Sequence, residues 1–213
     1  MLSEEVLAWT TKVAFICWGA EVTWLELIAF VAALAMVYFN IRVNPWGWPL
    51  AAFSSLLFGM LFWQSKLYAE ALLQLFFIVF SFWGLLQWLH GTQSAGQPLQ
   101  VGNASFSLML NCFGIFLGLW GAIAGLLIYS TDSQVPGWDA LPTAGSVIGQ
   151  WLLGRKYVQN WPVWVAVNLV SIGLFAYKGL WLTVLLYSLF TCLSFAGWRA
   201  WRQLSDRRVG LAS

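Results

Sequence analysis

Residues 106–129 read FSLMLNCFGIFLGLWGAIAGLLIY, without a single Asp, Glu, Lys or Arg. Crossing the hydrocarbon core of a bilayer takes about 20 mostly apolar residues in a helix. Lipid offers no partners to backbone N–H and C=O groups, so a lipid-exposed apolar run of this length has to satisfy them internally as a helix. The stretch therefore predicts a transmembrane helix and an all-α integral membrane protein.

The composition of the whole chain supports this class. Of its 213 residues, 61% are apolar and only 8% are charged, whereas soluble domains carry roughly 25% charged residues. This composition excludes a soluble enzyme and a disordered protein. The net charge of +2, without a run of Lys or Arg, gives no indication of a nucleic-acid partner, so the bilayer is the partner that the sequence implies.

Other apolar stretches resemble the first, and together they predict seven transmembrane helices. Before them, residues 1–21 are expected to form an N-terminal interfacial segment, with an amphipathic helix over most of its length. The polar tail, residues 202–213, is expected to be frayed. The membrane domain then covers residues 22–201, with predicted spans at 22–39, 46–63, 68–89, 106–129, 140–153, 161–177 and 180–201.

Loop charges predict the orientation of the chain, because Lys and Arg are enriched in cytoplasmic loops. Seven spans place the two termini on opposite sides of the membrane. One side holds the larger set of cations and should be cytoplasmic, which places the C-terminus inside. That side carries Arg42, Arg155, Lys156, Arg199, Arg202, Arg207 and Arg208, and the other carries Lys12, Lys66 and Lys178.

An internal repeat emerges when residues 41–88 are compared with residues 154–201. It implies two three-helix repeats, 22–89 and 140–201, joined by a connector at 90–139 that contains the fourth span. One connecting helix gives both repeats the same orientation, a parallel 3+1+3 arrangement as in SWEET-type carriers, whose substrate sites lie near the midplane at the repeat interface. Chance similarity between apolar helices is the alternative. The most informative identities are Arg42 with Arg155, Trp48 with Trp161, Pro49 with Pro162, Gly84 with Gly197, and Trp88 with Trp201.

Candidate substrate-binding residues follow one face of the sixth span. Trp161, Trp164 and Asn168 are spaced i, i+3, i+7, which aligns them on a helix. Indole faces hold flat or cationic rings, and a carboxamide both donates and accepts hydrogen bonds. The alternative for the tryptophans is an aromatic belt at the membrane surface, which fits Asn168 poorly because polar residues deep in a span face protein or water.

The repeat adds further candidates at matched positions. Trp48 corresponds to Trp161 and Ser55 to Asn168, while Gln74 of the third span corresponds to Tyr187 of the seventh. Polar side chains at equal depth in both repeats suggest a polar path. The alternative is ordinary hydrogen bonding between helices.

Enzyme chemistry is not indicated. His90, the only histidine, lies beside a polar linker, and neither a catalytic set nor a metal-ligand cluster can be assembled around it. No cofactor motif is present. No Asp or Lys occupies the middle of a span, whereas ion-coupled carriers usually embed such groups. These observations favour uncoupled passage of a neutral or weakly cationic substrate.

At this point the sequence resembles a known family. NPWGWPLAAFSSLLFGMLFW (44–63) and NWPVWVAVNLVSIGLFAYKGL (160–180) are similar to the two halves of PnuC-type nicotinamide riboside transporters. The resemblance implies a SWEET-related seven-helix fold, often a homotrimer, in the bacterial inner membrane. It also implies facilitated diffusion of nicotinamide riboside, a vitamin B3 precursor of NAD, with trapping by a separate cytosolic kinase. By the same analogy, Trp161, Trp164 and Asn168 contact the substrate.

Two alternatives stay open. The first is a carrier of thiamine or riboflavin, because relatives in the wider family resemble such carriers and thiamine is also a flat cation. A non-transporting membrane assembly protein is the alternative from another class, although matched polar positions have no purpose in such a protein.

Overall fold

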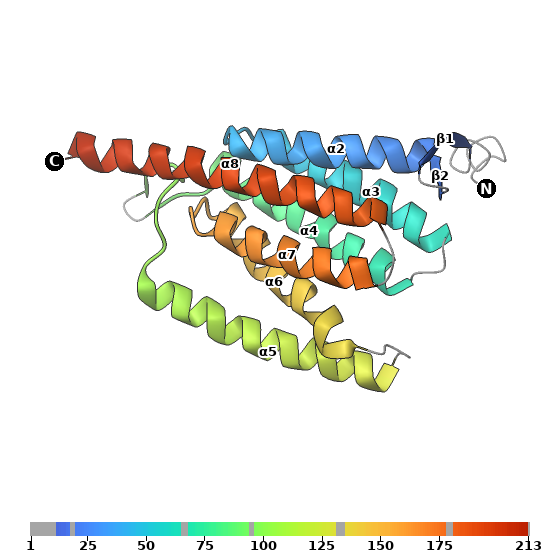
Figure 1. Ribbon diagram of the computed structural model, residues 1–213. Helices are drawn as coiled ribbons and strands as arrows, with labels where there is room; N and C mark the ends of the chain where they lie inside the picture. Colours follow the sequence, from blue (N-terminus) through green and yellow to red (C-terminus); the bar gives the residue numbers. More distant parts are fainter. Residues whose placement is uncertain are drawn as a thin grey trace. The chain divides into compact units, whose positions relative to one another are not determined.

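The computed structural model describes residues 12–17, 20–64, 68–93, 96–130, 135–177 and 181–212. Within these ranges the chain forms seven helices and one two-stranded hairpin (Figure 1). The elements are β1 (Val13–Cys17), β2 (Ala20–Thr23), α2 (Trp24–Ile41), α3 (Gly47–Gln64), α4 (Tyr68–His90), α5 (Phe106–Ser130), α6 (Pro136–Gly154), α7 (Asn160–Tyr177) and α8 (Trp181–Ala212).

The helices coincide with the predicted spans, and most ends agree within one or two residues. The helix α6 begins earlier than residue 140, because Pro136 is favourable at the start of a helix and Asp139 complements the dipole of the first turn. Four helices, α2, α4, α5 and α7, are long and apolar enough to cross a membrane. The described part of the chain is thus mainly α-helical and suited to a bilayer.

The N-terminal segment differs from the expected interfacial helix. Residues 13–17 and 20–23 pair as antiparallel strands, with Cys17 opposite Ala20 and Val13 opposite Thr23. Valine, isoleucine, phenylalanine and threonine favour extended backbone, which explains why this part of the segment is not helical. Residues 1–11 lie outside the described residues.

The C-terminal tail also differs from expectation, because it is helical rather than frayed. The helix α8 continues without interruption to Ala212. Two of its side chains beyond the predicted span hold the polar linker: Ser205 accepts a hydrogen bond from Asn103 (3.1 Å), and Arg208 donates to the carbonyl of Val101 (3.1 Å). These contacts stabilise the helical extension.

Side-chain caps fix two helix starts. The hydroxyl of Thr23 accepts a hydrogen bond from the backbone N–H of Glu26 (3.2 Å) at the start of α2. The hydroxyl of Ser105 does the same for the N–H of Leu108 (3.2 Å) at the start of α5. Each bond satisfies one of the backbone donors that a helix leaves open in its first turn.

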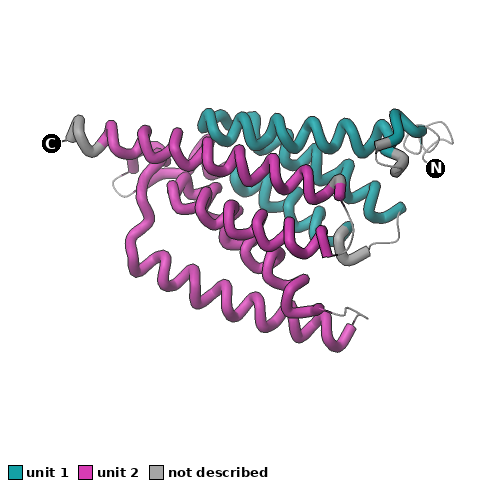
Figure 2. Tube along the Cα trace, viewed as in Figure 1, with its two compact units in different colours: residues 1–85 teal, residues 86–213 magenta. Residues whose placement is uncertain are grey.

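The chain divides into two compact units, residues 1–85 and 86–213 (Figure 2). In the first unit α2 packs along α3, with Leu25, Ala29 and Leu57 at the centre of the contact. In the second unit α6 lies between α5 and α7, and α7 packs against α8 (Figure 1). Cys112, Ile148 and Leu152 form the core between α5 and α6.

The turns α2–α3 and α6–α7 share one backbone geometry. Arg42 (φ −79°, ψ 3°) ends α2, and Arg155 (φ −86°, ψ 4°) ends α6. The next residues, Val43 (φ 54°) and Lys156 (φ 56°), both adopt the left-handed region. The helices that follow, α3 and α7, each have 18 residues. The residues aligned by the repeat therefore occupy the same local structure.

Candidate substrate-binding site

The proposed binding face belongs to α7, an apolar helix without Asp, Glu, Lys or Arg. The turn before it is fixed by Asn160, a fully buried residue whose amide donates to the carbonyl of Tyr157 (2.7 Å). Because α7 is regular from this residue on, Trp161, Trp164 and Asn168 follow one side of it. The predicted stripe exists as a continuous helical face.

Asn168 points into the protein. Its side chain is only 3% exposed, and its amide Nδ2 donates to the Oγ of Ser194 on α8 over 3.4 Å. A carboxamide buried in an apolar helix needs such partners, because desolvation without hydrogen bonds is costly. The pairing of Asn168 with Ser194 therefore fixes a polar spot between α7 and α8.

Trp161 is enclosed by α8. Its indole lies over Gly197, where an added Cβ would come within 2.5 Å of two ring carbons. The ring also meets Trp201 edge to face, with 5.5 Å between centroids and an angle of 88°. At 2% exposure, Trp161 faces the protein interior rather than the lipid headgroups, which is unlike an aromatic-belt residue.

Trp164 lies on the side of the stripe that meets α6. It is half-buried, and a Cβ at Gly149 would come within 3.0 Å of its Cε2. The glycine allows the indole to lie flat against the α6 backbone. One side of this ring is thus fixed by the protein, and its partial exposure leaves the remaining surface available.

The counterparts in the first unit have a related arrangement. Trp48, 1% exposed, lies over Gly84 of α4 as Trp161 lies over Gly197 of α8. Ser55 is buried. Gln74 of α4 is partly exposed and packs beside Gly59 of α3. In each unit a tryptophan at the start of a helix is paired with a glycine on the neighbouring helix.

Tyr187 extends the polar face of the second unit. Its ring packs against Phe175 of α7 at 5.3 Å between centroids, and its side chain lies beside Ser171. Ser171, 1% exposed, is not among the residues expected from the sequence. Its position, three residues after Asn168 on the same face, is the signal that could have revealed it.

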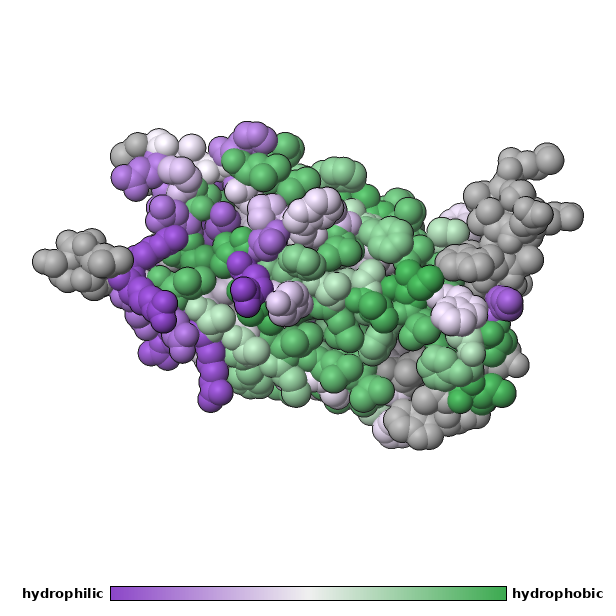
Figure 3. All heavy atoms as spheres, turned by 90° about the horizontal axis from the view of Figure 1, so that it is seen from above, coloured by the Kyte–Doolittle hydropathy of each residue, from purple (hydrophilic) through white to green (hydrophobic). Residues whose placement is uncertain are grey.

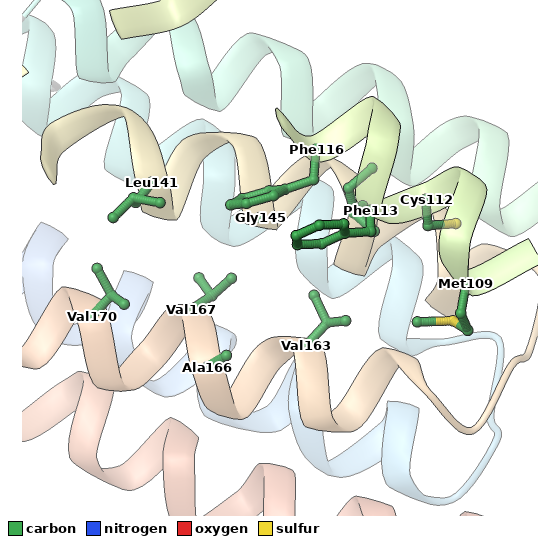
Figure 4. Close-up of a pocket in the computed structure, with 11 residues that line it drawn as sticks. Met109, Cys112, Phe113, Phe116, Leu141, Gly145, Val163, Ala166, Val167 and Val170 are labelled. Carbon is green, nitrogen blue, oxygen red and sulfur yellow. The ribbon is translucent and has the colours of Figure 1, made fainter. Parts of the chain in front are cut away.

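A separate cavity of about 250 Å³ lies between α5, α6 and α7. In Figure 4 its wall is formed by apolar side chains, among them Phe113 and Phe116 of α5, Leu141 of α6 and Val170 of α7. None of the predicted binding residues lines it. The cavity offers no hydrogen-bonding side chain other than a thiol, so it is unsuited to a polar vitamin.

Other kinds of site are not indicated in the described ranges. The residues there contain no group of three His, Cys, Asp or Glu side chains placed to hold a metal ion. His90 is exposed at the end of α4.

Comparisons with known proteins agree with this architecture. The chain is 25% identical over 207 residues to the nicotinamide riboside transporter PnuC of Escherichia coli K12, covering 86% of this chain and 87% of that protein. It is 24% identical over 208 residues to the riboflavin/roseoflavin transporter RibM of Streptomyces davaonensis, covering 93% and 94%. It also resembles the crystal structure of the vitamin B3 transporter PnuC, with a TM-score of 0.72 and 22% identity over 86% of this chain and 83% of that one.

The family comparison covers most of the membrane domain. Residues 23–203 match the family described as nicotinamide mononucleotide transporter. This range begins just before α2 and includes every helix from α2 to the membrane part of α8. The chain therefore belongs to this family of multi-pass membrane transporters.

Proposed function

We propose that this protein carries nicotinamide riboside across the bacterial inner membrane. The observation that carries the proposal is the similarity, along 86% of the chain, to a protein named as a nicotinamide riboside transporter. Family membership over residues 23–203 supports it. After uptake, a separate kinase phosphorylates nicotinamide riboside, which retains it in the cell for NAD biosynthesis.

The chemistry of the α7 face suits this substrate. Nicotinamide riboside combines a cationic pyridinium ring, a carboxamide and a ribose. Trp164 offers an indole face for the ring, a contact worth about 0.5–2 kcal/mol when desolvated. Asn168 offers a carboxamide for the polar groups. We assign direct contact to these two residues and keep Trp161, Gln74, Tyr187, Trp48 and Ser55 as the further candidates that the sequence predicts.

The same proposal includes a parallel 3+1+3 arrangement of seven transmembrane helices related to SWEET carriers. The repeats comprise residues 22–89 and 140–201, and residues 90–139 form the connector. The matching turns support it, because Val43 and Lys156 share an uncommon left-handed conformation at equivalent positions. The cations near the ends of α6 and α8 support a cytoplasmic C-terminus, because Lys and Arg are enriched on that side of the membrane.

Transport is proposed to be facilitated diffusion. The helices α3, α5 and α7 contain no charged residue. Glu26 and Asp139 lie in first turns, at helix ends. Proton-coupled carriers usually place acids or bases within the membrane, so the concentration gradient of the substrate supplies the driving force.

A homotrimer is proposed as the assembled state, and α5 is the helix best suited to form its interface. Only Cys112 of α5 is buried. On the face opposite Cys112, the described residues leave the space within 4 Å of a Cβ at Gly114, Gly118, Gly121 and Gly125 empty. Such small residues allow close approach of helices in lipid.

Uptake by proteoliposomes tests the proposed function. The purified protein should take up labelled nicotinamide riboside with saturation, and thiamine or riboflavin in excess should compete weakly. Collapsing the proton gradient should leave the initial rate unchanged. Absence of saturable uptake rejects the carrier, and loss of uptake without a proton gradient rejects the uncoupled mechanism.

Binding measurements test the site. Asn168→Ala and Trp164→Ala should each weaken binding of nicotinamide riboside about tenfold, the loss expected for one buried hydrogen bond or one ring contact. The exposed residues Asn111 and Trp138 provide matched controls, Asn111→Ala and Trp138→Ala. Unchanged affinity in both site variants places the substrate elsewhere.

Riboflavin is the second candidate substrate. The relative from Streptomyces davaonensis, named as a riboflavin/roseoflavin transporter, matches 93% of this chain. A flat tricyclic ring also fits an indole wall. Saturable uptake of riboflavin that exceeds uptake of nicotinamide riboside at equal concentration would reverse the order of the two candidates.

A further inference from the structure

The described residues of the polar linker after α4, 91–93 and 96–105, form a strap over the turn between α6 and α7. Gly102 pairs with this turn through two backbone bonds, to the carbonyl of Lys156 (3.1 Å) and from the N–H of Val158 (2.9 Å). The Nζ of Lys156 donates to the carbonyl of Leu99 (3.0 Å) and lies 5.1 Å from the centroid of Trp88. These bonds fix the position of the linker.

Between the strap and the turn lies a polar cavity of about 250 Å³, lined by Gln93, Leu99, Arg155 and Tyr157. The guanidinium of Arg155 is held in place by a hydrogen bond from NH1 to the Oε1 of Gln87 (3.0 Å). One bond leaves most of the five guanidinium N–H donors available to a ligand.

The charge around this cavity is positive. Lys156 and Arg208 each donate to a linker carbonyl, at Leu99 and Val101. Over the described ranges, no carboxylate forms an ion pair with either residue or with Arg155. Three fixed cations that contact only neutral partners favour an anionic ligand, and Arg suits a phosphate by its forked geometry.

The apolar cavity of Figure 4 starts at the same end of these helices. Tyr157 lines the polar cavity and also packs against the cluster of Cys112, Ile148 and Leu152. Cys112 and Ile148 in turn line the apolar cavity. Tyr157 therefore lies where a cationic polar space and an apolar one adjoin. The apolar groove follows α7 from Val163 to Val170, a length of about 10 Å at 1.5 Å per residue.

We propose that these two spaces together bind one anionic phospholipid, with its phosphate at Arg155 and one acyl chain in the groove between α5, α6 and α7. The α6–α7 turn connects two helices of the membrane domain, so it lies where headgroups lie. Basic pockets between transmembrane helices are suited to anionic headgroups. A free phosphate ester would leave the apolar groove unused, and a neutral lipid would leave Arg155 without a counter-charge.

Titration of the full-length protein in a neutral detergent, followed by native mass spectrometry, tests the proposal. Phosphatidylglycerol should bind at least about tenfold more tightly than phosphatidylcholine with the same chains. Glycerol phosphate, the headgroup alone, should not bind in the same concentration range. Equal binding of the two lipids overturns the proposal, as does glycerol phosphate binding as tightly as the lipid.

Variants separate the two halves of the site. Arg155→Gln should lower the affinity for phosphatidylglycerol about tenfold, whereas Arg42→Gln, at the equivalent and exposed position of the α2–α3 turn, should not change it. Ala166→Phe fills the groove and should also weaken binding, while Leu169→Phe, at an exposed position of α7 outside the groove, should not.

A folding defect is distinguished from a binding defect by Arg155→Lys. This variant keeps the positive charge and should retain the preference for phosphatidylglycerol at a normal thermal midpoint. If Arg155→Gln has a normal thermal midpoint and binds phosphatidylglycerol as well as the unmodified protein, the assignment of the headgroup to Arg155 is wrong.

Discussion

Gly197 determines how closely α8 approaches the indole of Trp161, as Gly84 determines the approach of α4 to Trp48. Buried tryptophans at both positions fill the space that the glycines leave open. Interiors are packed so densely that one additional methyl group displaces its neighbours. The tryptophan–glycine pairs therefore set the spacing of the helices that bear the proposed binding residues.

Gly197→Ala should destabilise the protein by about 1–3 kcal/mol, because the added methyl overlaps the Trp161 ring. Thermal unfolding in detergent measures the change. Gly173→Ala is the control, because no described atom lies within 4 Å of the added Cβ, and alanine favours a helix over glycine. Equal midpoints for both variants would contradict the proposed packing role.

The burial of Lys156 predicts that the stability of the folded protein depends on pH. Burial lowers the pKa of its amino group below the ordinary value of 10.5, and the positive charge of Arg208 lowers it further. Between the lowered pKa and 10.5, the unfolded chain binds more protons than the folded one, so the contribution of Lys156 to stability rises with pH.

Lys156→Met should remove this rise. The thermal midpoint of the unmodified protein minus that of the variant is expected to increase from pH 7 towards pH 10. Measuring both proteins across this range in one detergent cancels the effects of the other titrating groups. A difference that stays constant with pH would show that burial of Lys156 does not affect its protonation.

Sequence spacing predicted the residue positions well where one helix determines them. Trp161, Trp164 and Asn168 share a face because they belong to one regular helix. Their partners, Gly149 on α6 and Ser194 on α8, depend on how helices pack, which spacing within one segment does not encode. Ser171 was accessible to the same reasoning and was missed because a serine in a span is a weak signal.

At the scale of elements, apolar runs located the seven helices of the described residues, because lipid leaves a lipid-exposed backbone no other regular structure. The N-terminal hairpin and the helical tail were missed for a different reason. Both lie in sequence of mixed polarity, where the apolar pattern gives no signal and contacts with other segments decide the structure. The tail is helical where Ser205 and Arg208 bind the linker. These contacts join residues more than 100 positions apart in the sequence, so no local pattern predicts them.

The backbone of the turn between α2 and α3 is strained at Val43. A β-branched residue with φ 54° is unfavourable, and the left-handed region costs roughly 1–2 kcal/mol for residues other than glycine. Val43→Gly should therefore raise stability by about 1 kcal/mol after the larger entropy of glycine in the unfolded chain is deducted. Thermal unfolding in detergent provides the measurement.

Two further variants show whether the gain arises from the backbone. Val43→Ala should raise the stability less than Val43→Gly does, because alanine still has a Cβ. Lys156→Gly, at the equivalent turn, should destabilise the protein because it removes the side-chain bond to Leu99 and the contact with Trp88. A loss of stability in Val43→Gly would mean that the valine side chain contributes more than its conformation costs.

At the scale of the whole molecule, the proposed homotrimer depends on the exposed glycines of α5. Gly118→Leu should disrupt the proposed homotrimer by keeping α5 from close contact with a neighbouring copy. Light scattering of the purified protein in detergent should then give a smaller mass. The control is Ile115→Leu, a conservative change at an exposed position of α5. An unchanged mass for Gly118→Leu would place the interface on another helix.

The length of α8 has a mechanical consequence. Its 32 residues extend about 48 Å at 1.5 Å per residue, whereas the hydrocarbon core is about 30 Å thick. The part that projects beyond the lipid carries Ser205 and Arg208, which tie the strap to α8, while Gly102 ties the same strap to the α6–α7 turn. A change in the tilt of α8 relative to the α6–α7 turn therefore has to break or stretch the hydrogen bonds of this linker.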